Sequence, residues 1–153
     1  MNIEEMIDEN LVSFGFEADT KDDVLKGIGK MMYEAGKVSD LKSYIDGLYA
    51  RETEFPTGIG NGFAIPHCKS DCVNEAAFTL VRLNRPVEWN SMDGKPVEYV
   101  IMLAAPNTSD NVHLKMLSKL AVKLLDEEFR DTLRHAMSLT EIKSLFASEA
   151  ESK

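Results

Sequence analysis

Arg51 and His67 are two residues whose types and spacing could support phosphoryl chemistry. Arg51 lies just before a glycine-rich segment, TGIGNGFAIPHCK over residues 57–69, and His67 lies near the end of that segment. Neutral imidazole is a good nucleophile at neutral pH, and a guanidinium is a planar clamp for phosphate or carboxylate. These two residues are therefore candidates for a phosphoryl site, and a surface arginine and a surface histidine are the plain alternatives.

The glycines at positions 58, 60 and 62 do not form a nucleotide-binding motif. No Gly-Lys-Ser/Thr follows them, and a dinucleotide fingerprint would run from a strand into a helix. Here the segment runs into the apolar residues 63–65 and then Pro66. The glycines are expected to allow positive φ angles and a close approach of the backbone to another group, with a plain turn as the alternative.

Pro66 is expected to hold His67 rigidly at a strand end, because proline fixes φ and donates no backbone hydrogen bond. His113 lies in the first turn of a predicted helix, where backbone N–H groups favour an anion. Loops at the strand ends of an α/β sheet can converge at one edge, so His67 and His113 can lie at the same site. A solvated histidine remains the alternative for His113, and nothing further is expected of His135, late in a short helix.

The elements that must position these residues alternate between helices and strands. Apolar periodicity predicts helices over 20–36, 39–51 and 112–125, two shorter helices over 126–136 and 138–150, and strands over 11–18, 76–83 and 97–105. The apolar stripe expected on the third helix consists of Leu114, Leu117, Leu120, Ala121, Leu124 and Leu125. Helices before, between and after apolar strands predict one layered α/β domain over residues 1–153.

The composition limits the partners and the compartment. There are 17 basic and 26 acidic residues, and the net charge is −9. This balance argues against nucleic acid or an anionic membrane as the main partner, although it does not exclude a local basic pocket. No stretch approaches ~18 apolar residues, and the acidic N-terminus lacks the features of a signal peptide. We therefore expect a cytoplasmic protein without membrane insertion.

Cys68 and Cys72 have the spacing C-x3-C, and no second pair completes a zinc site. No other set of metal ligands is evident, so no metal is expected. The spacing permits a disulfide, but a chain of this length can bury enough surface to fold without one. Two reduced thiols are the expected state.

Three segments of the chain resemble a known family. RETEFPTGIGNGFAIPHCK is similar to the active-site signature of enzyme IIA proteins of the fructose–mannitol class, from the bacterial phosphoenolpyruvate-dependent sugar phosphotransferase system. PVEWNSMDGKPVEYVIMLAAP and HLKMLSKLAVKLLDEEFRDTL resemble the next two segments of that family, in the same order and spacing. The resemblance covers nearly the whole chain. It implies a mixed β-sheet flanked by helices on both faces, in α/β/α layers.

The resemblance also implies a phosphocarrier that uses no cofactor. His67 matches the phosphorylated histidine, and His113 and Arg51 match residues that hold the phosphoryl group. Loop positions that shape the pocket would be Thr57, Gly58 and Asn61. The phosphocarrier HPr would donate the phosphoryl group, a IIB component would accept it, and the membrane IIC component would be reached indirectly. We expect attack through Nε2 of His67, with the acceptor for the other ring nitrogen unidentified.

The resemblance leaves three questions open. The family usually has glycine after Pro-His, whereas this chain has Cys68, which places a thiol beside the site. A regulatory IIA protein of the nitrogen type would have an identical site, although VEWNSMDGKPV looks more like the transport branch. The sugar cannot be read from a domain that contacts proteins. Fructose is the default, and mannitol, galactitol and other polyols or ketoses stay open.

Overall fold

Two mixed β-sheets form the centre of the molecule. The computed structural model describes residues 3–108 and 111–151. The five-stranded sheet has the order β1 (Val12–Phe16), β6 (Leu80–Val87), β7 (Val97–Val100), β3 (Phe63–Ala64) and β2 (Gly58–Gly60). The three-stranded sheet has the order β4 (His67–Ser70), β8 (Leu103–Pro106) and β5 (Ala77–Phe78). Each sheet contains parallel and antiparallel pairs, as expected for a mixed sheet.

The chain passes between the two sheets three times, from β3 to β4, from β5 to β6 and from β7 to β8. The strands predicted over 76–83 and 97–105 are therefore each broken in two. Thr79 lies at one break, where its Oγ1 accepts a hydrogen bond from Met102 N at 3.0 Å. The Thr79 hydroxyl thus takes the place of a backbone carbonyl as the acceptor for Met102 N. The apolar periodicity of the sequence does not reveal this exchange of acceptors.

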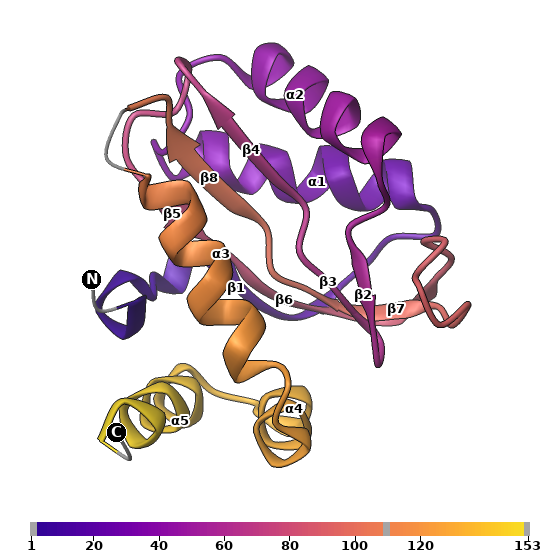
Figure 1. Ribbon diagram of the computed structural model, residues 1–153, viewed down its shortest axis with the longest axis vertical. Coiled ribbons are helices and arrows are strands. Elements are labelled where there is room, and N and C mark those ends of the chain that lie inside the picture. Colours follow the sequence, from indigo (N-terminus) through magenta and orange to yellow (C-terminus); the bar gives the residue numbers. More distant parts are fainter. Residues whose placement is uncertain (1–2, 109–110, 152–153) are drawn as a thin grey trace.

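Helices cover both faces of the sheets, which confirms the predicted α/β/α layers (Figure 1). One face carries α1 (Lys21–Glu34) and α2 (Leu41–Glu54), and the other carries α3 (Val112–Lys123), α4 (Glu127–His135) and α5 (Leu139–Glu151). Two short 3₁₀ helices, Ile3–Met6 and Glu9–Leu11, precede β1. Among the described residues, no helix has the length and apolar character needed to cross a membrane.

Side-chain caps explain where α1 and α2 begin. Thr20 Oγ1 accepts from Asp23 N at 3.1 Å, and Asp40 Oδ1 accepts from Ser43 N at 3.1 Å. Such caps satisfy backbone N–H groups that have no partner within the helix. The predicted starts are confirmed, whereas α2 runs to Glu54, three residues beyond the predicted end.

The buried face of α3 differs from the predicted apolar stripe. Met116, Leu120 and Leu124 are buried, whereas Leu114 and Leu125 are 58% and 80% exposed. Ala121 is exposed as well. The helix carries two overlapping apolar stripes, and its packing against β8 selects the one that begins at Met116. Asn111 occupies the N-cap position of α3 without a side-chain capping bond.

Candidate functional site

His67 begins β4 at the break between the two sheets and is 7% exposed. Its Nδ1 lies 2.7 Å from the carbonyl oxygen of Ile65, and Arg51 Nε donates to its Nε2 at 3.0 Å. A carbonyl oxygen only accepts, so Nδ1 carries the proton, and Nε2 has the lone pair that accepts from Arg51. These contacts select the neutral Nδ1–H tautomer, which makes Nε2 the nucleophilic atom. The acceptor that the sequence left unidentified is the Ile65 carbonyl.

The surroundings of His67 favour the neutral imidazole. Burial lowers the pKa of His67 below its ordinary value of 6.5, and the charge of Arg51 lowers this pKa further. The hydrogen bond to Ile65 and the charge of Glu52 oppose this shift, and the net pKa stays lowered. His67 is therefore neutral at pH 7, as a nucleophile must be.

Arg51 lies in the last turn of α2 and is held at two points. Besides the contact with His67, its Nη1 donates to the carbonyl oxygen of Phe55 at 2.7 Å. The extension of α2 to Glu54, followed by extended backbone at Phe55, places that carbonyl within reach. The guanidinium is thereby directed at the imidazole, and an anion bound at Nε2 would lie beside it.

Two cavities meet at His67. One has a volume of about 260 Å³ and is lined by Arg51, Phe55, Pro56, Thr57, Gly58, Ile59, Ile65, His67, Met92, Leu117 and Ala121. The other, of about 330 Å³, is lined by Gly47, Ala50, Arg51, Glu54, His67, Cys68 and Lys69. The first cavity is the better candidate for the site, because its lining includes both Arg51 and the backbone of the glycine segment.

His113 is in the first turn of α3, the helix that contributes Leu117 and Ala121 to the 260 Å³ cavity. Its side chain lies outside the described part of the chain. The convergence of His113 with His67 therefore stays a prediction. His135 lies far along α4, where its Nδ1 is 2.8 Å from the carbonyl oxygen of Asp131, and it lines neither cavity.

Thr57 and Gly58 line the cavity at His67. Thr57 is buried, and its carbonyl oxygen accepts from Ile65 N at 3.0 Å. A side chain at position 58 would collide with Oγ of Ser91, so only glycine fits there. Gly58 thus allows the backbone of the glycine segment to lie close to Ser91. Of the two interpretations of these glycines, a close approach and a plain turn, this position fits the first.

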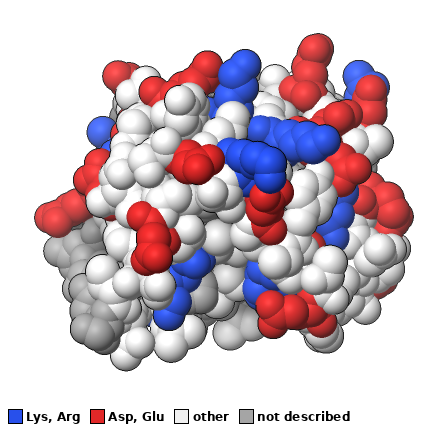
Figure 2. All heavy atoms as spheres, turned by 90° about the horizontal axis from the view of Figure 1, so that it is seen from above, with Lys and Arg blue, Asp and Glu red and all other residues white. Residues whose placement is uncertain are grey.

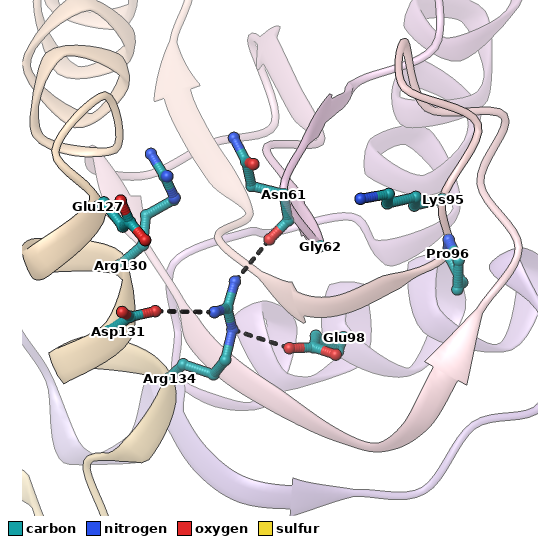
Figure 3. Close-up of a pocket in the computed structure, with 9 residues that line it drawn as sticks. All are labelled: Asn61, Gly62, Lys95, Pro96, Glu98, Glu127, Arg130, Asp131 and Arg134. Atoms are coloured by element: carbon teal, nitrogen blue, oxygen red, sulfur yellow. Dashed lines mark hydrogen bonds and ion pairs between the residues drawn. The ribbon is translucent and has the colours of Figure 1, made fainter.

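Asn61 lies elsewhere, and the geometry does not support its expected role in the pocket. Asn61 and Gly62 have φ angles of 59° and 83° and form the two-residue turn between β2 and β3. Arg134 Nη2 donates to the carbonyl oxygen of Asn61 at 2.6 Å, and Arg134 also pairs with Glu98 and Asp131 (Figure 3). Asn61 lines a separate cavity of about 400 Å³ there. An Asn-Gly turn accounts for its residue type.

Glu52 is a residue of the site that the sequence interpretation missed. Its side chain is 6% exposed and pairs with Lys21 Nζ at 2.7 Å. It also accepts hydrogen bonds from the backbone N and the hydroxyl of Thr57. One signal could have revealed it, because an acidic residue in the last turn of a helix opposes the helix dipole and needs a compensating partner.

The thiol of Cys68, beside His67, is buried and lines the 330 Å³ cavity but not the 260 Å³ cavity. Cys68 and Cys72 are both free thiols, as expected. Burial raises the pKa of Cys68 to about 11. The thiol is therefore protonated at neutral pH and a poor nucleophile. Its sulfur packs against Gly47 of α2, a helix position without a Cβ.

A family model described as "Phosphoenolpyruvate-dependent sugar phosphotransferase system, EIIA 2" matches residues 5–149. The chain belongs to this family. Its members are phosphotransfer components, so this EIIA chain is a phosphocarrier-type protein, and the resemblance of the signature is confirmed.

Two curated relatives and one solved structure illustrate the range of the EIIA family. The chain is 35% identical over 138 residues to the fructose-specific EIIABC component of Bacillus subtilis, covering 90% of this chain but 22% of that protein. It is 30% identical to the fructose-specific EIIA component of Haloferax volcanii, with 92% of each chain covered. The nitrogen regulatory protein IIA-Ntr of Neisseria meningitidis is 29% identical, with a TM-score of 0.86 over 94% of this chain and 98% of that one.

Proposed function

We propose that this EIIA protein carries a phosphoryl group on Nε2 of His67, accepting it from phospho-HPr and passing it to a IIB component. The observation that supports this most is the fixed Nδ1–H tautomer, because it leaves the Nε2 lone pair facing Arg51 at the cavity. The fructose-specific relatives favour uptake of a fructose-like sugar or polyol as the purpose of the transfer.

In the proposed transfer, the Nε2 lone pair attacks phosphorus, and the bond between phosphorus and its donor breaks as the new P–N bond forms. The electron pair of the broken bond returns to the donor. Nδ1 keeps its proton and its hydrogen bond to Ile65, which stabilises the positive charge developing on the ring. Arg51 leaves the lone pair and binds the phosphoryl oxygens, a role that His113 is proposed to share.

The surface around the cavity is suited to a protein partner. Phe55, Ile59 and Met92 line the cavity and are among the exposed large apolar side chains. Apolar side chains at the rim of a site favour association with another protein surface. We place the protein in the cytoplasm with both proposed partners, and the membrane IIC component is reached only through IIB.

A phosphorylation-dependent regulator of the nitrogen type is the second candidate function. It is favoured by the fold likeness to IIA-Ntr of Neisseria meningitidis. The same site chemistry serves both functions, so the acceptor discriminates between them. Rapid transfer from the phosphorylated protein to a IIB domain favours sugar transport, and the absence of transfer to every candidate IIB domain favours regulation.

Phosphorylation in a reconstituted system tests the proposed site. The protein is incubated with phosphoenolpyruvate, enzyme I and HPr, and acid-labile phosphate is measured. We expect stoichiometric labelling of the wild type, none of His67→Ala, and normal labelling of His135→Ala, because His135 is exposed on α4. Full labelling of His67→Ala would exclude His67 as the acceptor.

A further inference from the structure

Two consecutive residues of α2, Arg51 and Glu52, are linked by hydrogen bonds to the two ring nitrogens of His67. Arg51 contacts Nε2 directly at 3.0 Å. Glu52 is connected to the opposite side of the ring by a series of hydrogen bonds that ends at Nδ1. Together these contacts connect Glu52 through Thr57, Ile65 and His67 to Arg51. We call this closed series of hydrogen bonds, which begins and ends on the last turn of α2, the circuit.

The first part of the circuit joins Glu52 to Thr57. One carboxylate oxygen accepts from the Thr57 hydroxyl, and the other accepts from Thr57 N at 3.2 Å and pairs with Lys21 Nζ at 2.7 Å. The Thr57 hydroxyl also accepts from Trp89 Nε1 at 3.2 Å. Thr57 is therefore fixed through both its side chain and its backbone.

The second part joins Thr57 to the imidazole through the backbone of Ile65. Ile65 N donates to the Thr57 carbonyl at 3.0 Å, and the Ile65 carbonyl accepts from His67 Nδ1 at 2.7 Å. Thr57, Ile65 and His67 are all buried. The carbonyl that selects the tautomer thus belongs to a residue whose own N–H is anchored by Thr57.

A buried carboxylate at position 52 costs more free energy than a purely structural contact would require. Its burial removes it from water, and its place in the last turn of α2 opposes the helix dipole. Lys21 balances the charge, and the ammonium group lies 5.2 Å from the centre of the Trp89 ring. The donors that converge on Glu52 include both polar groups of Thr57, the residue at the start of the circuit.

We propose that Glu52 is a positioning residue for phosphoryl transfer, which holds the ring of His67 in the Nδ1–H tautomer through Thr57 and Ile65. This inference rests on the proposed function of His67 as the phosphoryl acceptor. Glu52 itself does not line the cavity, so it acts through other residues.

Kinetics of the Glu52→Gln variant provide the first test. The amide keeps one acceptor oxygen but turns a donor toward Thr57 N–H or Lys21, so the circuit is broken at nearly constant volume. We expect kcat for transfer from phospho-HPr to fall on the order of 10- to 100-fold, because misplaced reacting groups lose effective molarity. KM for phospho-HPr should not change, because Glu52 lies beneath the surface that meets the donor.

Asp46→Asn is the matched control. It removes the carboxylate of an exposed ion pair with Lys42 on the same helix, at a Nζ–Oδ2 distance of 2.9 Å. Its kinetics should match those of the wild type.

The second test needs no phosphoryl donor. Nitrogen-15 NMR of the unphosphorylated protein should show the Nδ1–H tautomer of His67 in the wild type and in Asp46→Asn. Glu52→Gln should show a mixture with the Nε2–H tautomer. Thr57→Val, which removes the hydroxyl, should behave like Glu52→Gln. Thr57→Ser, which keeps the hydroxyl, should show the wild-type spectrum.

These outcomes separate the inference from the proposed function. A wild-type protein that is never labelled on His67 contradicts the proposed function, and the NMR spectra still decide the role of Glu52. An unchanged tautomer in Glu52→Gln, or a raised KM with unchanged kcat, overturns the positioning role. If Glu52→Gln fails to fold, Thr57→Val and Thr57→Ser decide the question by the same two readouts.

Discussion

Burial makes the protonation of His67 depend on folding. The unfolded chain keeps a histidine pKa near 6.5, whereas the pKa of His67 in the folded protein is lower, first because of burial and then because of Arg51. At a pH between these two values, the unfolded chain binds more protons than the folded one. The free energy of unfolding therefore falls as the pH falls through this interval. Above the interval, His67 is neutral in both states, and the free energy of unfolding no longer depends on its protonation.

We predict that His67→Gln weakens this dependence of stability on pH. Glutamine does not titrate, so the proton uptake linked to unfolding is lost. Urea unfolding measured at several pH values from about 7.5 to 5 would compare the slopes of the two proteins. Parallel slopes would show that the imidazole of His67 is not the group responsible.

At the scale of elements, the distance between α2 and β4 depends on the residue pair Gly47 and Cys68. A Cβ at position 47 would collide with Sγ of Cys68, whereas it would lie 3.7 Å from the Cβ of Cys68, an ordinary contact. Gly47 lies one turn before Arg51 on α2. The pair therefore affects how closely the helix that carries the guanidinium approaches the strand that carries the imidazole.

Gly47→Ala should destabilise the protein by roughly 1–3 kcal/mol, the usual cost of overpacking a core. In the Cys68→Ala background the collision is absent, and alanine at position 47 should stabilise α2 by up to about 1 kcal/mol through its helix propensity. Urea unfolding of the two single variants and the double variant measures this coupling. Additive effects would mean that the two side chains do not compete for the same space.

At the scale of the whole molecule, the net charge is negative and does not by itself point to a binding surface. The chain has a net charge of −9, and on the face seen in Figure 2 basic and acidic side chains are intermixed. The His67 cavity is instead distinguished by the exposed apolar residues that line it. A protein partner is expected to meet the molecule there.

Met92→Lys tests this surface. Met92 is 75% exposed at the cavity, and a lysine would place a charge where an apolar contact is expected. KM for phospho-HPr should rise several-fold, equivalent to about 1 kcal/mol, with kcat nearly unchanged. Tyr33→Lys on α1, where Tyr33 is 47% exposed and lines neither cavity at His67, is the control. Equal effects of the two substitutions would argue against a specific docking surface.

Local signals in the sequence were enough to predict most elements of the fold. Thr20 and Asp40 cap the helices that follow them, because a cap depends on residues only two or three positions apart. The broken strands were not predicted, since the Thr79 hydroxyl that replaces a ladder partner reaches Met102, a residue distant in sequence. The buried stripe of α3 was partly wrong for a similar reason, because its packing against β8 chose between two apolar stripes.

The sequence by itself determined the family, the histidine proposed as nucleophile and the arginine beside it, because the signature places these residue types at set positions of one continuous segment. Only the tertiary structure decided how they are held. The Ile65 carbonyl that accepts from His67, the contact of Glu52 with Thr57, and the position of Asn61 outside the His67 cavity follow from contacts of the glycine segment with β4, α2 and α4. Such contacts depend on how elements pack in three dimensions, and no local pattern of residues specifies that packing.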